Sequence, residues 1–258
     1  MNTNTMKSIN KVVFIIPLLW VLGFKFFIFH LLSLFIFIKT IITARRNNQR
    51  IRISIEHKLL FIFTIIYATS IFINIGNSEK SRVIASIYNL TYWIIGLFTM
   101  VSIYNDDALC KKDIIEFSKS IKNVGLFIIL LFIISLVLWI VKIDFLSIDT
   151  PTRLFLPTSL KSTLLGDATN MYIYTTDWMF NRNILRLVGI FNYPAETAIS
   201  MIFIILFTLY YYINKGNKGI KNYIVIGLLS ISFIMALSRI TWVGILLALF
   251  IVNVVLKI

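Results

Sequence analysis

The sequence is poor in the residue types that build metal sites and disulfides. It contains one cysteine, Cys110, and two histidines, His30 and His57. A single cysteine excludes an internal disulfide and a metal site made of several cysteines. The paired His or Cys spacing of metal sites is absent, and so are the glycine-rich phosphate loop and the nucleophile elbow. We therefore expect no metal, no cofactor and no hydrolysis of ATP in the cytosol.

Charged residues are scarce, and acidic residues are scarcer than basic ones. Charged residues make up 14% of the chain, whereas a soluble domain carries about 25%. The 25 Lys and Arg residues outnumber the 11 Asp and Glu residues, which gives a formal net charge of +14. Because most of these cations fall in short loops between apolar runs, they indicate contact with a lipid bilayer. We expect no nucleic-acid partner.

Long apolar runs take up most of the chain. Hydrophobic residues make up 59% of it, and the mean hydropathy is +0.88. Runs of about 18 apolar residues or more predict transmembrane helices, and a soluble protein could not bury this much apolar surface. The sequence therefore predicts an all-α, polytopic helical membrane protein with about eight transmembrane helices in a single membrane domain, residues 1–258. The spans are expected within residues 12–43, 59–75, 83–103, 123–141, 195–213, 222–237 and 240–256.

Two segments need an interpretation of their own. Residues 12–43 are too long for one span, because a helix rises about 1.5 Å per residue and the hydrocarbon core is ~30 Å thick. They form either two short spans that turn near Gly23–Lys25 or one long tilted helix, and we favour the pair. Residues 105–122 carry four lysines and four acids. They predict a surface loop with a short amphipathic helix.

The charge of the loops predicts the orientation. When the loops are assigned alternately to the two sides, sixteen Lys and Arg residues fall on one side and nine on the other. Short cytoplasmic loops are rich in Lys and Arg, so the first side is predicted to be cytoplasmic. Residues 142–188, the longest non-membrane segment, then form one long extracytoplasmic loop. Arg186 and Arg239 face outward in this arrangement.

The stretch from Arg186 to Ala198, RLVGIFNYPAETA, stands where a polar segment gives way to an apolar run. Arg182, Arg186 and Arg239 all lie at span boundaries on the predicted outer side. An arginine at such a boundary can simply extend toward the lipid head groups, and this interpretation stays open. Guanidinium groups also bind phosphate oxygens in a bidentate manner and stay charged at any relevant pH. The cluster therefore suits a lipid-linked phosphate or pyrophosphate.

Nearby residues extend this hypothesis. Gly189 would allow the backbone to approach an anion closely, and Pro194 fits the first turn of a helix. Glu196 is the only acid inside the predicted spans. It either gains from the helix dipole in the first turn, or pairs with an arginine, or acts as a general base. Asp177, in the outer loop, is a second candidate for the general base.

The order of these residues resembles a known family. Arg-x-x-Gly-x-Phe-x-x-Pro enters one span, and Ser-Arg leads the next-but-one span. This pattern is similar to the O-antigen ligase and O-antigen polymerase superfamily. The motif region covers about residues 182–256, and the matching residues are Arg186, Gly189, Phe191, Pro194, Ser238 and Arg239.

The resemblance implies a multi-pass glycosyltransferase of the bacterial cytoplasmic (inner) membrane. Such enzymes take a glycan from undecaprenyl pyrophosphate on the outer face of the membrane and pass it to a growing chain or to the lipid A core. Arg186 and Arg239 would hold the carrier pyrophosphate without a metal, and an acceptor hydroxyl would attack the anomeric carbon. Arg182, Gly189 and Ser238 are further substrate-binding candidates. Chain-length regulator and flippase proteins are the expected partners.

Several functions share these residues. We favour polymerisation of undecaprenyl-pyrophosphate-linked oligosaccharide repeat units for O-antigen (lipopolysaccharide), capsule or exopolysaccharide. An O-antigen ligase is the second candidate, and it is disfavoured because no outward histidine is present. A transporter or flippase for a lipid-linked glycan would use the same arginines without chemistry. Family members continue with a further outer loop and further spans, so a truncated and inactive remnant is also an alternative.

Overall fold

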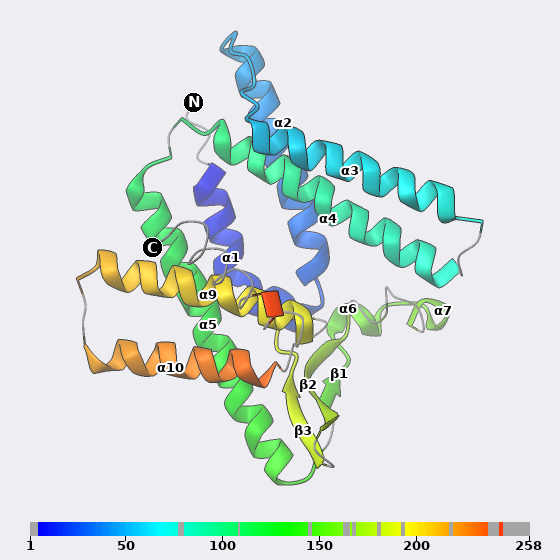
Figure 1. The fold of residues 1–258 in the computed structure, drawn as a ribbon, viewed down its shortest axis with the longest axis vertical. Helices are drawn as coiled ribbons and strands as arrows, with labels where there is room; N and C mark the ends of the chain where they lie inside the picture. Colours follow the sequence, from blue (N-terminus) through cyan, green and yellow to red (C-terminus); the bar gives the residue numbers. More distant parts are fainter. Residues whose placement is uncertain are drawn as a thin grey trace. The chain divides into compact units, whose positions relative to one another are not determined.

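Helices dominate the chain, and the apolar runs form most of them (Figure 1). The computed structural model describes residues 5–76, 80–107, 109–143, 146–161, 166, 169–179, 182–191, 194–216, 219–236 and 243–244. Its elements are α1 (Thr5–Leu22), α2 (Lys25–Arg46), α3 (Ile55–Asn74), α4 (Lys80–Tyr104), α5 (Lys111–Ile140), β1 (Leu146–Ile148), α6 (Pro151–Leu154), α7 (Thr158–Lys161), β2 (Met171–Met179), β3 (Arg182–Leu187), α9 (Pro194–Asn214) and α10 (Ile220–Met235).

Six helices among the described residues are long and apolar enough to cross a membrane, namely α1 to α5 and α9. Helix α10 is apolar but shorter, with 16 residues. The prediction of a helical membrane protein is confirmed at this level. The last predicted span, residues 240–256, lies outside the described residues except for 243–244.

The first apolar region forms two helices. Helix α1 ends at Leu22 and α2 begins at Lys25. Between them Gly23 has a φ of 83°, a left-handed conformation that glycine adopts at little cost, and its N–H donates to the carbonyl of Trp20 at 3.0 Å. The break agrees with the paired interpretation of residues 12–43 and not with one continuous helix.

The chain divides into two compact units, of which the first comprises Met1–Val12 and Phe24–Phe117. Within it, α4 packs against both α2 and α3. The seam between α2 and α4 is partly polar: His30 Nε2 lies 2.9 Å from Thr91 Oγ1, and Ser33 Oγ donates to the carbonyl of Ile95 at 2.9 Å. Most outward side chains of this unit are apolar and exposed, as expected for helices that face lipid.

The second unit comprises Val13–Gly23 and Ser118–Ile258. Helices α9 and α10 pack side by side (Figure 1). Both approach α5 at Gly125, where a Cβ atom would lie only 2.7 Å from Ile204 Cγ2 and 3.1 Å from Leu229 Cδ2. The fully buried Ile128 of α5 belongs to the same core. Close packing of apolar side chains around a small residue therefore holds these three helices together.

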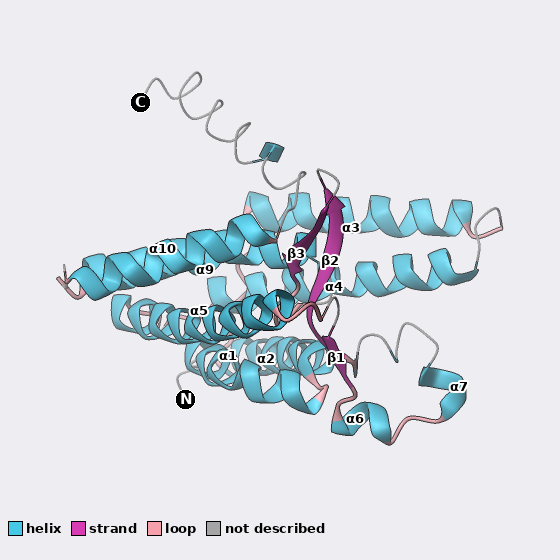
Figure 2. Cartoon of the chain, turned by 90° about the horizontal axis from the view of Figure 1, so that it is seen from below, coloured by secondary structure: helices cyan, strands magenta, loops and turns pink. Residues whose placement is uncertain are grey.

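A small antiparallel sheet with the strand order β1-β2-β3 lies in the second unit (Figure 2). It lies within the segment that the sequence predicted only as a long loop, residues 142–188. The sheet, with the short helices α6 and α7, adds ordered structure to an otherwise helical protein. Neither the sheet nor its register was predicted.

Helix α5 is longer than the span predicted at residues 123–141. It contains 30 residues and begins at Lys111. The amphipathic helix predicted within residues 105–122 is therefore the first part of α5 and not a separate surface element. Backbone hydrogen bonding continues from the charged turns into the apolar ones, because no proline or glycine interrupts the sequence between them before Gly125.

Candidate functional site

The hairpin of β2 and β3 carries several of the residues that the sequence singled out. Thr175 pairs with Arg186, Asp177 with Ile184, and Met179 with Arg182. Directly opposed residues of an antiparallel pair lie on one face, and residues two apart in a strand share that face. The register therefore places the backbone positions of Asp177, Arg182 and Arg186 on the same face of the sheet.

The opposite face of the hairpin is apolar and buried. Tyr174 pairs with Leu187, and Leu185 lies two residues before Leu187 in β3. All three side chains are completely buried. The Tyr174 hydroxyl also donates to the carbonyl of Ile143, just after α5. Burial of this face fixes the register, because a slip of one residue would turn the apolar set outward.

Arg186 connects the sheet to the end of α10. Its Nε donates to the carbonyl of Ala236 at 3.4 Å, and Ala236 is the C-cap residue of α10. The last carbonyls of a helix lack intrahelical partners and carry partial negative charge, so a guanidinium group is favoured there. Ser238 and Arg239 are two and three residues further along the sequence, and both lie outside the described residues.

The turn after β3 is fixed by backbone hydrogen bonds. Gly189 has a φ of 62°, and its N–H donates to the carbonyl of Ile173 at 2.9 Å. A Cβ atom at this position would meet only Ile128 Cγ2, at 4.0 Å. Glycine is therefore required here by the left-handed backbone and not by crowding. Close approach of an anion to Gly189 stays a prediction.

The start of α9 is anchored to this turn. Pro194 is the first residue of the helix, as the sequence predicted. The fully buried Thr197 donates from its hydroxyl to the carbonyl of Val188 at 2.5 Å. Glu196 lies in the first turn and is exposed. This is the position in which the helix dipole favours a carboxylate.

The structure thus brings several predicted site residues into one region of the second unit. The positions of Asp177, Arg182 and Arg186 share a sheet face, while β3 contacts both α9 and α10. Within the described residues, no group of three or more His, Cys, Asp or Glu residues could hold a metal ion. Glu196 lies in the first turn of α9, one of the two helices that β3 contacts.

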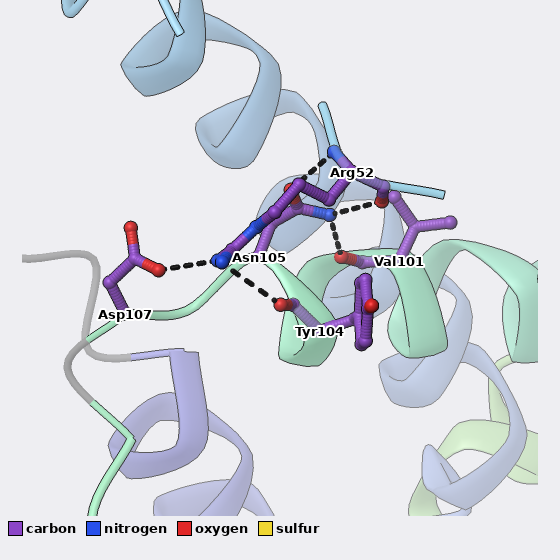
Figure 3. Close-up of polar contacts among 5 residues, drawn as sticks. All are labelled: Arg52, Val101, Tyr104, Asn105 and Asp107. Carbon is purple, nitrogen blue, oxygen red and sulfur yellow. Dashed lines mark hydrogen bonds and ion pairs between the residues drawn. The ribbon is translucent and has the colours of Figure 1, made fainter. Parts of the chain in front are cut away.

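A second polar cluster was missed by the sequence analysis. Arg52, in the connection between α2 and α3, contacts Asn105 and Asp107 at the end of α4 (Figure 3). More than fifty residues separate the partners in the sequence, and neither an asparagine nor an aspartate in a polar loop predicts such a contact. Only the packing of α4 against α2 and α3 brings them together.

The chain matches no family model, no curated protein and no solved structure in comparisons of its sequence and fold.

Proposed function

We propose that the chain polymerises undecaprenyl-pyrophosphate-linked oligosaccharide repeat units on the outer face of the bacterial cytoplasmic membrane. One observation carries the proposal: the hydrogen bond from Arg186 to Ala236 joins β3 to the end of α10. The two motifs that resemble the O-antigen polymerase superfamily are some fifty residues apart in the sequence. This contact supports their working as one site, because Ser238 and Arg239 are only two and three residues after Ala236 in the sequence.

The proposed reaction needs charge stabilisation more than a metal. The acceptor hydroxyl oxygen forms a bond to the anomeric carbon of the donor sugar, and the bond from that carbon to the pyrophosphate oxygen breaks. Undecaprenyl pyrophosphate leaves with the bonding electrons, and Arg186 and Arg239 stabilise its negative charge. Glu196 or Asp177 accepts the proton of the hydroxyl.

The rival explanation is that Arg186 only caps α10. Capping uses Nε in the geometry of the structure, and a guanidinium group has five N–H donors in a planar fork. A capping role therefore needs one N–H donor, whereas bidentate binding of an anion needs the planar fork. Lysine at position 186 would keep the charge but lose the fork, whereas alanine would lose both.

The test is binding of the carrier. The purified full chain in lipid nanodiscs is titrated with undecaprenyl pyrophosphate, and the affinities of Arg186→Ala and Arg186→Lys are compared with that of the wild type. Loss of charge-assisted hydrogen bonds should weaken binding about 10- to 100-fold in the alanine variant. The lysine variant should fall between the alanine variant and the wild type.

Arg153→Ala is the matched control, because Arg153 belongs to the same 142–188 segment and pairs with Asp149 at 3.2 Å. Its affinity for the carrier should stay close to that of the wild type. Equal affinity of the wild type and Arg186→Ala would overturn the binding assignment. Glycan chain lengths in the source bacterium then separate the reactions: a polymerase-null strain makes only single repeat units. Full-length chains that stay on the undecaprenyl carrier and are not passed to the lipid A core would instead indicate a ligase.

A further inference from the structure

The connection between α2 and α3 is a well-defined turn. The backbone N–H groups of Asn47 and Gln49 donate to carbonyls in the last turns of α2, at 3.0 and 2.8 Å. Asn48 has a φ of 52°, and a left-handed residue of this kind is a common way to end a helix. These hydrogen bonds fix the end of α2, and the chain therefore leaves the helix in a defined direction.

Asn105 holds the next part of this connection. Its Oδ1 accepts the N–H of Arg52 at 2.8 Å, and its Nδ2 donates to the carbonyl of Arg52 at 2.9 Å. The same Nδ2 also donates to the carbonyl of Val101, at 2.8 Å (Figure 3). One amide side chain thus pairs with both backbone groups of Arg52, as a neighbouring β-strand would.

Arg52 itself is neutralised. Its guanidinium forms an ion pair with Asp107 and donates to the carbonyl of Tyr104 at 3.5 Å. The guanidinium carbon also lies 5.9 Å from the centre of the Tyr104 ring, within the range of a cation–π contact. Arg52 is therefore a positioning residue of the connection and not one of its available cations.

Three other arginines lie at or within the connection and have no such partner: Arg45 and Arg46 end α2, and Arg50 follows. Arg45, Arg46 and Arg50 are exposed, and within the described part of the chain none of them is in an ion pair. They belong to a segment whose backbone is held at both ends, by α2 and by Asn105. Little conformational entropy would be lost when they bind a common anion, which favours binding.

Exposed isoleucines accompany these arginines. Ile53 is 55% exposed and Ile55 is 68% exposed. Side chains of this kind are unfavourable in water, whereas at a bilayer surface they enter the boundary between head groups and acyl chains. Helices α2 and α3 are both long and apolar enough to span the membrane. The connection between them must then lie at a membrane surface, whichever side that is.

We propose that residues 45–55 form a preorganised binding site for an anionic phospholipid. Arg45, Arg46 and Arg50 bind the head-group phosphate, Ile53 and Ile55 contact the acyl chains, and Asn105 holds the segment in shape. The isoleucines select a lipid over a soluble phosphate. The site belongs to the first unit, whereas Arg186 belongs to the second, and it does not depend on the reaction proposed there.

The test measures lipid selectivity of the full chain by native mass spectrometry. The protein is purified in detergent and titrated with phosphatidylglycerol and phosphatidylcholine, and the ratio of the two bound lipids is recorded. A basic residue near an anionic surface contributes about fivefold, so replacing three arginines should lower phosphatidylglycerol binding on the order of a hundredfold at low salt. The variant is Arg45→Gln/Arg46→Gln/Arg50→Gln.

The matched control is Lys111→Gln/Lys112→Gln/Lys119→Gln, which removes the same charge from α5. Phosphatidylglycerol binding should stay close to that of the wild type. An equal loss in both triple variants would show that the attraction comes from net charge alone, and would overturn the site. Retention of binding in the arginine variant would overturn it as well.

Two further variants test the parts of the site that carry no available charge. Asn105→Ala keeps every cation, and it should lower phosphatidylglycerol binding measurably if the held conformation matters; unchanged binding would contradict the preorganisation. Ile53→Ser/Ile55→Ser should weaken binding of the lipid but not of glycerol phosphate. If glycerol phosphate competes with phosphatidylglycerol at equal concentration, the site takes a soluble phosphate and the lipid assignment is wrong.

Discussion

The two compact units hold their helices together by different interactions. In the first, side-chain hydrogen bonds cross the seam between α2 and α4: His30 to Thr91, Ser33 to a carbonyl, and Thr99 Oγ1 to Ser33 Oγ at 3.0 Å. In the second, α5, α9 and α10 meet around Gly125 through apolar contact. The difference also appears in burial. None of the apolar window of α4 is buried, against 39% of that of α5.

This contrast indicates which unit tolerates change. Interhelical hydrogen bonds in membranes contribute modestly, because the separated helices also find partners. Close packing tolerates added volume poorly, because a buried side chain has no space to move into. We therefore expect substitution of the closely packed glycines in the second unit to be far more damaging than the loss of a hydrogen bond in the first.

The largest effect is expected for Gly23→Ala. A Cβ atom there would lie 2.9 Å from the carbonyl oxygen of Thr169 and closer still to the Thr150 hydroxyl, while φ stays at 83°. Left-handed backbone strain and overpacking together should lower the free energy of unfolding by about 2–5 kcal/mol. Unfolding by a denaturing detergent in mixed micelles measures it.

Gly76→Ala is the control for that substitution. Gly76 has no positive φ and no atom within 4 Å of a built Cβ. Its free energy of unfolding should change by less than about 0.5 kcal/mol. If Gly23→Ala proves equally mild, the close contact of this turn with Thr150 and Thr169 is not a feature of the folded protein.

An intermediate effect is expected for Gly125→Ala. The added methyl group would lie 2.7 Å from Ile204 Cγ2, so α9 must shift, at a cost of about 1–3 kcal/mol. Gly227→Ala in α10 has no atom within 4 Å and should be neutral or stabilising by about 0.5–1 kcal/mol. The free energies of unfolding of both variants are measured in the same micelles. If Gly125→Ala proved more stable than Gly227→Ala, the packing contrast would be refuted.

The smallest effect is expected in the polar seam. A double-mutant cycle with His30→Leu and Thr91→Val isolates the hydrogen bond of 2.9 Å between their side chains. The coupling energy should be about 0.6 kcal/mol, the average for interhelical hydrogen bonds in membranes. A coupling well above 2 kcal/mol would show that the first unit depends on its polar seam as much as the second depends on packing.

Much of the helical fold could be predicted from hydropathy. The predicted spans at 59–75, 83–103 and 195–213 lie close to α3, α4 and α9. Apolar runs give the position of a span because lipid excludes unpaired polar groups. They do not give the ends of a helix, because charged residues outside the membrane are solvated by water whether they are helical or not. Hydropathy therefore did not predict that α5 starts twelve residues before the expected span.

The sheet and the site geometry could not be predicted in the same way. Strand β1 pairs with β2 across more than twenty residues of sequence, and three residues are too few to show a periodic pattern. The contact of Arg186 with Ala236 depends on how β3 meets α10, which no local spacing encodes. What the sequence did provide was the set of residue types that suit an anion.

The sheet is tethered at both ends to apolar helices, which limits its reach. Six residue steps separate Ile140 from Leu146, and seven separate Leu187 from Pro194. At about 3.6 Å per residue these connections extend no further than roughly 25 Å, and the hydroxyl of Thr197 holds the second one shorter still. The tethered ends of the sheet therefore lie within that distance of the ends of α5 and α9. The donor proposed above, a glycan on a lipid carrier, would reach this part of the sheet by diffusion within the membrane alone.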